Sequence, residues 1–134
     1  MTATANGVDT SPVVRGVWVL ENILGTPPAS PPPDVEPLPT DTRGAASIRE
    51  RLDLHRKNEA CASCHRKIDP MGFAFENFDV VGRWRDKYRG DRNPIDASTV
   101  MANGDKIEDI VEFKQMLKSR KPLIVRNLAG KMLT

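Results

Sequence analysis

Two cysteines and a histidine within five residues constrain this 134-residue chain more than any other feature. Cys61 and Cys64 are the only cysteines, and His65 follows the second one directly. Thiols at this spacing lie one helical turn apart, and the Cys-x-x-Cys-His pattern is typical of c-type haem attachment. In that chemistry the thiols bond to the two vinyl groups of the porphyrin, and the histidine binds the iron as proximal ligand. The motif therefore predicts one covalent haem c.

The same cysteines allow two other interpretations. A redox-active dithiol of the thioredoxin type requires alternating strands and helices, which the sequence pattern does not indicate. A zinc site could use all the Cys and His residues of the chain, namely Cys61, Cys64, His65 and His55. Structural zinc sites usually space the residues of their second ligand pair, however, whereas His65 adjoins Cys64. A zinc or scaffolding module is therefore kept as an alternative.

A proximal histidine needs a hydrogen-bond acceptor for its second ring nitrogen, because that contact fixes the ring orientation and the ligand basicity. A backbone carbonyl near Asp69 and Pro70 is well placed in the sequence for this role, although a proline that simply ends a turn is the alternative. Phe73 and Trp84 are predicted to pack near the porphyrin and exclude water, with ordinary core packing as the alternative.

The sixth iron ligand has two candidates, first His55 and then Met101. His55 lies six residues before Cys61, so the intervening loop could fold it over the opposite face of the haem. Met101 lies on a predicted hairpin arm from which a thioether could reach iron. An open sixth position would instead suit a haem enzyme or a gas or peroxide sensor. For the other methionines, Met71, Met116 and Met132, core packing is the commoner explanation.

The remaining sequence predicts mostly helical structure. Ser11 and Pro12 have the positions of an N-cap and a first helical residue, and the helix should extend to Gly25. Seven of the thirteen residues 27–39 are proline, so this segment is expected to be an extended strap. Ser47 and Glu50 have the spacing of a capping box at the start of a helix that runs toward residue 58.

Beyond the haem motif, the pair Asp69–Pro70 is expected to break the chain before a short helix over residues 73–78 that stops by Gly82. Asn103–Gly104 predicts a two-residue hairpin turn, and apolar spacing predicts helices over residues 110–117 and 123–133. The predicted fold is a small cytochrome c-like helical domain of about four helices with a short β-hairpin. We divide the chain into an N-terminal segment (1–25), the proline-rich strap (26–44) and the haem domain (45–134).

Charge and hydropathy exclude two function classes. The 20 basic and 18 acidic residues are mixed along the chain, so the basic stripe of a nucleic-acid-binding protein is missing. The most apolar stretch, residues 13–24, is interrupted by charged and amide residues and is too short for a membrane span. The N-terminus lacks the pattern of a secretory signal, so we expect a fragment or a separately exported piece. Lys57, Arg66 and Lys67 flank the motif and could steer an acidic redox partner.

Several motifs together resemble one family, the C-terminal haem region of the large planctomycete-type multidomain cytochrome c proteins. The resemblance implies an exported, multidomain protein of largely undefined biochemical role, of which this chain is an excised or separately encoded end, and hence a periplasmic or otherwise extracytoplasmic location. The haem motif itself favours an electron carrier over an enzyme, as a module or subunit of a larger redox assembly with redox proteins as partners. His55 and Arg56 match a His-Arg pair ahead of the haem motif, which implies His55 as a ligand or as a propionate contact. The matching stretches are residues 10–16, 18–22, 55–58, 61–65, 68–70, 72–79 and 94–98 and the final helices.

Overall fold

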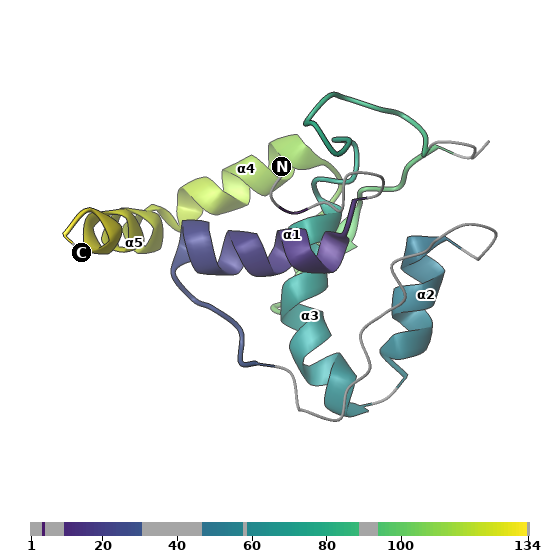
Figure 1. Cartoon of the computed structure of the whole chain (residues 1–134), viewed down its shortest axis with the longest axis horizontal. Coiled ribbons are helices and arrows are strands. Elements are labelled where there is room, and N and C mark those ends of the chain that lie inside the picture. Colours follow the sequence, from purple (N-terminus) through teal and green to yellow (C-terminus); the bar gives the residue numbers. More distant parts are fainter. Residues whose placement is uncertain (1–3, 5–9, 31–46, 58, 89–93, 134) are drawn as a thin grey trace.

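The computed structural model describes residues 4, 10–30, 47–57, 59–88 and 94–133, and these residues form a mostly helical molecule with one short hairpin (Figure 1). The predicted fold class is thereby confirmed. The elements are α1 (Pro12–Trp18), the π-helix η2 (Val19–Leu24), α2 (Ile48–His55), α3 (Glu59–Phe73), β1 (Thr99–Val100), β2 (Lys106–Ile107), α4 (Ile110–Ser119) and α5 (Lys121–Met132).

The N-terminal helix begins and ends where the sequence predicts. The hydroxyl of Ser11 accepts a hydrogen bond from the backbone N–H of Val14 at 3.3 Å, and Pro12 occupies the first turn, where no N–H is needed. After Trp18 the helix continues as the π-helix η2, which the sequence did not indicate. Gly25 closes it with a φ of 67°, a left-handed conformation that glycine adopts without steric cost.

Two glycines let α1 and α3 cross in direct backbone contact. A Cβ atom on Gly16 would lie 2.0 Å from the carbonyl oxygen of Ile68, and one on Gly72 would lie 1.7 Å from that of Pro12. Neither position can therefore hold a larger residue without separating the helices. Figure 1 shows α1 lying across α3 at this crossing. The helix that carries the two cysteines is thus held firmly against the N-terminal helix.

The prediction that Asp69–Pro70 breaks the chain is wrong. Helix α3 continues through Pro70 to Phe73, and the predicted short helix over residues 73–78 is replaced by turns. Pro70 cannot donate the helical hydrogen bond to the carbonyl oxygen of Arg66, and Arg66 is an exposed residue near the end of the helix. The burial of Ile68 and Met71 against α1 and the core outweighs that loss.

The predicted capping box begins α2. Ser47 Oγ accepts from the Glu50 N–H at 3.2 Å, and a Glu50 carboxylate oxygen accepts from the Ser47 N–H at 3.0 Å. The helix ends at His55, three residues before the predicted end. Residues 27–30 form no helix or strand, and the rest of the predicted proline strap lies outside the described residues.

The hairpin has the predicted position but a different loop. Thr99 pairs with Ile107 and Val100 with Lys106, and the Met101 N–H donates a backbone hydrogen bond of 2.8 Å to Asp105 across the loop. The loop therefore has three residues instead of two, because Gly104, at a φ of 91°, provides the left-handed position that closes such loops. Helices α4 and α5 confirm the last two predicted helices.

The hydrophobic core lies where α1, η2 and α3 meet the hairpin and α4. It draws on both the N-terminal and the C-terminal parts of the chain, so the two parts share one core. Its buried residues are Val19, Leu20, Leu24, Ile68, Met71, Ala74, Met101, Ile107, Ile110 and Phe113. In the part of the chain that the structure describes, no helix has the length and apolar character of a membrane span.

A polar network is buried beside this core, with Glu76 at its centre. The Glu76 side chain is 0% exposed and forms an ion pair of 3.1 Å with the equally buried Arg15. Its second carboxylate oxygen accepts hydrogen bonds from Thr10 and Tyr88, each at 2.9 Å, and lies 3.4 Å from Arg85. Burial, reinforced by the charge of Glu76, raises the pKa of the Tyr88 hydroxyl well above its usual value. This network ties the N-terminal helix to the segment that follows α3.

Candidate functional site

Helix α3 carries both cysteines and the adjacent histidine. Cys61 and Cys64 are free thiols, each half-buried, and they lie three residues apart on the first turns of the helix. Cys64 also packs against the hydrophobic core. Two accessible thiols one turn apart have the spacing that attachment of a planar group through two thioether bonds requires.

His65 is held by a carboxylate of its own helix. The ring nitrogen Nδ1 lies 2.8 Å from Asp69 Oδ1, and the Asp69 side chain is 0% exposed. The acceptor is therefore the Asp69 carboxylate and not the predicted backbone carbonyl near Asp69–Pro70. The reason is that α3 continues past Asp69, so the four-residue spacing places the carboxylate beside His65 on the same helical face. Because Nδ1 is engaged, Nε2 is the nitrogen left to bind a metal.

The other oxygen of Asp69 is unusual for a buried carboxylate. Oδ2 is inaccessible and has no hydrogen-bond partner among the described residues. The nearest cation is Arg56, whose Nη1 lies 3.7 Å away, too far for a hydrogen bond. The same guanidinium forms a close contact with Asp53. Asp69 thus makes one short hydrogen bond, from Oδ1 to His65, while Oδ2 has only the ion pair with Arg56.

His55, the first candidate for the sixth ligand, lies directly beside His65. The two ring centroids are 4.9 Å apart, with an angle of 73° between the ring planes. Two imidazoles on opposite sides of one metal, with bonds of about 2.1 Å, hold their centroids about 6 Å apart or more. The structure therefore brings the two histidines together, but a shared metal would require α2 to move outward. Ligation by His55 stays a prediction.

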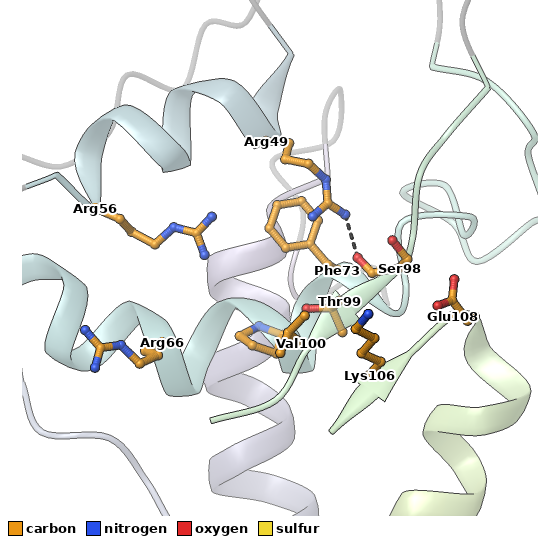
Figure 2. A pocket seen from close by; sticks show the side chains of 10 residues that line it. Arg49, Arg56, Arg66, Phe73, Ser98, Thr99, Val100, Lys106 and Glu108 are labelled. Carbon is orange, nitrogen blue, oxygen red and sulfur yellow. Dashed lines mark hydrogen bonds between the residues drawn. The ribbon is translucent and has the colours of Figure 1, made fainter. Parts of the chain in front are cut away.

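A cavity of about 400 Å³ opens between α2, α3 and the hairpin. Figure 2 shows Arg49 and Arg56 extending from α2 toward the cavity and Lys106 on β2, while the side chain of Arg66 on α3 extends away from these residues. Among the described residues, Glu108 is the one acidic residue of the lining. Its volume is in the range of small-molecule sites, and its charged lining favours an anionic ligand. The described residues that line it are Arg49, Arg56, Arg66, Pro70, Phe73, Ser98, Thr99, Val100, Lys106 and Glu108.

The cavity adjoins the His65–Asp69 pair. Arg56 lines the cavity and also lies 3.7 Å from Asp69, whereas Arg66 and Pro70 point about 100° away from His65 and Asp69 on the helix. Phe73 lies at the inner wall, where the guanidinium of Arg49 covers its ring at 4.2 Å (Figure 2). Arg49 is itself held by the carbonyl oxygens of Asp96 and Ser98 at 2.8 and 2.7 Å.

The predicted packing residues divide between the cavity and the surface. Phe73 and Pro70 line the cavity, and their contact with a haem stays a prediction. Trp84 does not, because its side chain is 56% exposed and packs edge-to-face on Phe78, with a hydrogen bond from its indole N–H to Asp86. The haem contact predicted for Trp84 stays a prediction.

Core packing accounts for three of the methionines that were considered near the site. Met101 is 4% exposed within the hydrophobic core, so packing accounts for it, and its role as a ligand stays a prediction. Met71 is buried and Met116 packs against the core, as expected. Met132 is 77% exposed, so the expectation of a core position was wrong there: α5 buries none of its residues.

The zinc alternative finds no assembled site. Among the residues that the structure describes, no group of three or more His, Cys, Asp or Glu side chains has the arrangement of metal ligands. His65 turns toward Asp69, and His55 packs on the His65 ring. The four predicted zinc ligands are therefore not gathered around one point.

Sequence reasoning missed three features of the site. The carboxylate of Asp69 could have been found from its four-residue spacing to His65 on one helix, once that helix was known to pass Pro70. Arg49 and Lys106 carry no local signal, since they come from segments distant in sequence and meet only in the folded chain.

Comparison with known families gives one match. The family model PSCyt3, described as a protein of unknown function (DUF1588), matches residues 1–88 and so includes both cysteines, both histidines and Asp69. Neither the comparison with curated proteins nor that with solved structures gives a match.

Proposed function

The chain belongs to the PSCyt3 family, whose name denotes a cytochrome-type domain, and we propose that it binds one haem c and transfers single electrons. Cys61 and Cys64 would hold the porphyrin through two thioether bonds, and His65 would bind the iron through Nε2. The haem supplies the one-electron chemistry. The protein anchors it, orients the histidine and limits access of water. The observation that carries the proposal is the pair of free thiols on one turn of α3, next to a histidine held by Asp69.

Cys61, Cys64 and His65 do not line the cavity, so its contribution to the proposal is limited to charged and apolar groups on a neighbouring face of α3. Phe73 and Pro70 form apolar parts of the cavity wall. Every haem carries two carboxylates, and the cations available to pair with them are Arg49, Arg56 and Lys106. The fit to a haem therefore rests on the donor set, which is two free thiols and one imidazole on the same helix. One movement is implied, since His55 packs on His65 and would have to shift for a ligand to bind on that side of the ring.

A location outside the cytoplasm follows from the chemistry proposed. Covalent haem attachment of this type accompanies export, so we infer a periplasmic or other extracytoplasmic protein. Lys57, Arg66 and Lys67 surround the motif with exposed positive charge and would favour an acidic redox protein as partner. Arg66 pairs with Glu59 at 3.5 Å, which reduces its share of this charge.

The optical spectrum of protein produced together with a c-type haem attachment system tests the proposal. We expect a Soret band and sharp low-spin bands on reduction, retained after acid–acetone extraction of free haem. Cys61→Ala with Cys64→Ala should lose the extraction-resistant haem, and His65→Gln should lose the low-spin spectrum. Ser63→Ala is the matched control, because Ser63 lies on the same turn but offers no bond to porphyrin or iron.

The rival function is a haem enzyme or a gas or peroxide sensor with an open sixth position. A reduced protein that is high-spin and binds carbon monoxide at once would favour it over electron transfer. His55→Ala sharpens the comparison. If His55 moves to bind the iron, this variant alone should turn from low-spin to high-spin, whereas Met101→Ala should not.

A further inference from the structure

The hydrogen bond between His65 and Asp69 should affect the midpoint potential of an iron bound to His65. We propose that Asp69 is a positioning residue that holds His65 as a strongly donating ligand and thereby favours the oxidised state of the bound iron. This inference rests on the haem proposed above. It concerns only the side chains of this chain and the equilibrium between ferric and ferrous iron.

The geometry gives Asp69 two effects on the histidine. At 2.8 Å from Nδ1, a buried carboxylate requires a proton on Nδ1, so Nε2 is left unprotonated for the metal. The same bond shifts negative charge toward the ring, which raises the basicity of the ligand. A more basic ligand stabilises ferric iron more than ferrous iron, because the ferric ion has the higher charge.

The environment of Asp69 preserves this effect. The carboxylate is 0% exposed, so water does not screen its charge. Its second oxygen has no hydrogen-bond donor among the described residues, and no backbone N–H there draws charge away from it. Arg56 is the one nearby counter-charge shown, and it lies 3.7 Å away while it also contacts Asp53. Arg56 therefore moderates the charge of Asp69 without forming the hydrogen bond that would neutralise it.

These contacts predict opposite shifts of the midpoint potential for two substitutions. Asp69→Asn keeps the size of the side chain but removes its charge, so the ligand becomes a weaker donor and the midpoint potential rises. Arg56→Gln removes the moderating cation and keeps Asp69, so the potential falls. A merely structural role for Asp69 predicts the reverse for Asp69→Asn, because a loosened site admits water, which stabilises the more highly charged ferric ion.

The test is redox titration of the haem-loaded protein and its variants. For Asp69→Asn we expect the ferrous-to-ferric ratio at a fixed solution potential to rise about tenfold, which equals about 59 mV for one electron; lost outer-shell partners change metal affinity about 10–100-fold. Arg56→Gln should lower the ratio. The matched control is Asp53→Asn, which removes the exposed partner of Arg56 without touching His65 and should shift the ratio less than about twofold.

A second readout follows the bond itself. In the five-coordinate ferrous form that a His55→Ala background should provide, the iron–histidine stretching frequency should fall in Asp69→Asn and stay unchanged in Asp53→Asn. An unchanged or lowered potential in Asp69→Asn overturns the inference while leaving the haem proposal intact. Should Asp69→Asn fail to fold, a raised or unchanged potential in Arg56→Gln has the same meaning. Wild-type protein without covalent haem overturns both proposals.

Discussion

Two buried carboxylates seven residues apart, Asp69 and Glu76, have opposite surroundings. Both side chains are 0% exposed. Both oxygens of Glu76 have partners, with Arg15 on one and Thr10 and Tyr88 on the other. Asp69 has one short contact, to His65, and its other oxygen accepts no hydrogen bond in the described part of the chain. We conclude that Glu76 is built for stability, whereas Asp69 is built to act on His65.

The comparison shows how a structural buried carboxylate can be distinguished from a functional one in this fold. Buried charges are costly unless paired and hydrogen-bonded, so a complete network indicates a structural role. An incomplete hydrogen-bond network beside a potential metal ligand indicates that the charge is kept for function despite its free-energy cost. The Arg15 side of the network is not perfect, since Arg15 Nε has no partner among the described residues, but its other nitrogens bind Glu76 and two carbonyl oxygens.

The largest effect would break the comparison by separating α1 from α3, the helix that carries Asp69 and leads into the turn with Glu76. Gly72 lies between Asp69 and Glu76, and a Cβ there would collide with the Pro12 carbonyl oxygen. Gly72→Ala should therefore cost more than about 5 kcal/mol and leave the protein largely unfolded, as judged by circular dichroism and urea denaturation. Gly130→Ala is the control, because a Cβ there meets no atom within 4 Å and alanine favours a helix. A folded Gly72→Ala protein would contradict the crossing described.

Removal of the charge of Glu76 comes next in magnitude. Glu76→Gln leaves Arg15 buried without its counter-ion, and the free energy of unfolding should fall by about 3–5 kcal/mol. Urea denaturation measures the loss. Glu59→Gln, at a side chain that is 89% exposed, should change stability by less than about 0.5 kcal/mol. Equal losses in the two variants would remove the structural role assigned to Glu76.

In the haem-free protein, Asp69→Asn should lower the free energy of unfolding much less than Glu76→Gln does. The asparagine of Asp69→Asn would keep an acceptor for His65 and would remove a charge that has no second hydrogen bond, so the substitution should cost at most about 1.5 kcal/mol. The measurement is the same denaturation series. A loss as large as that of Glu76→Gln would make Asp69 a structural residue like Glu76 and would end the contrast between them.

The smallest effect concerns alkaline pH. Tyr88 has a raised pKa in the folded protein, so it keeps its proton where the unfolded chain loses it near pH ~10. Above that pH the unfolded state binds fewer protons, and stability should fall by less than about 1 kcal/mol up to about pH 10.5. Tyr88→Phe should remove this part of the slope. Identical pH profiles for both proteins would show that Tyr88 titrates freely and does not belong to the network.

Local signals in the sequence predicted those parts of the fold that depend on neighbouring residues. Ser11 with Pro12, Ser47 with Glu50, and Gly25 each act through hydrogen bonds or backbone freedom within a few residues, and each marks the predicted helix end. Pro70 misled the prediction, because its local cost is outweighed by packing of α3 against α1, a contact between segments far apart in the sequence.

The candidate site follows the same division. The spacing of Cys61, Cys64 and His65 is a local pattern and was predicted directly. The hydrogen bond of His65 was expected at the right place in the sequence but from the wrong group, since the choice of carboxylate over carbonyl depends on the length of α3. The cation-lined cavity is assembled from α2, α3 and the hairpin, and no local pattern indicates it.

Intact-mass spectrometry of protein made with an active haem attachment system tests the central claim most directly. The account predicts that the wild-type chain, measured after denaturation, is heavier by the mass of a single haem, and that a chain with Cys61→Ser and Cys64→Ser gains none. A wild-type chain that keeps its bare polypeptide mass, while a known c-type cytochrome in the same cells is modified, would contradict the account.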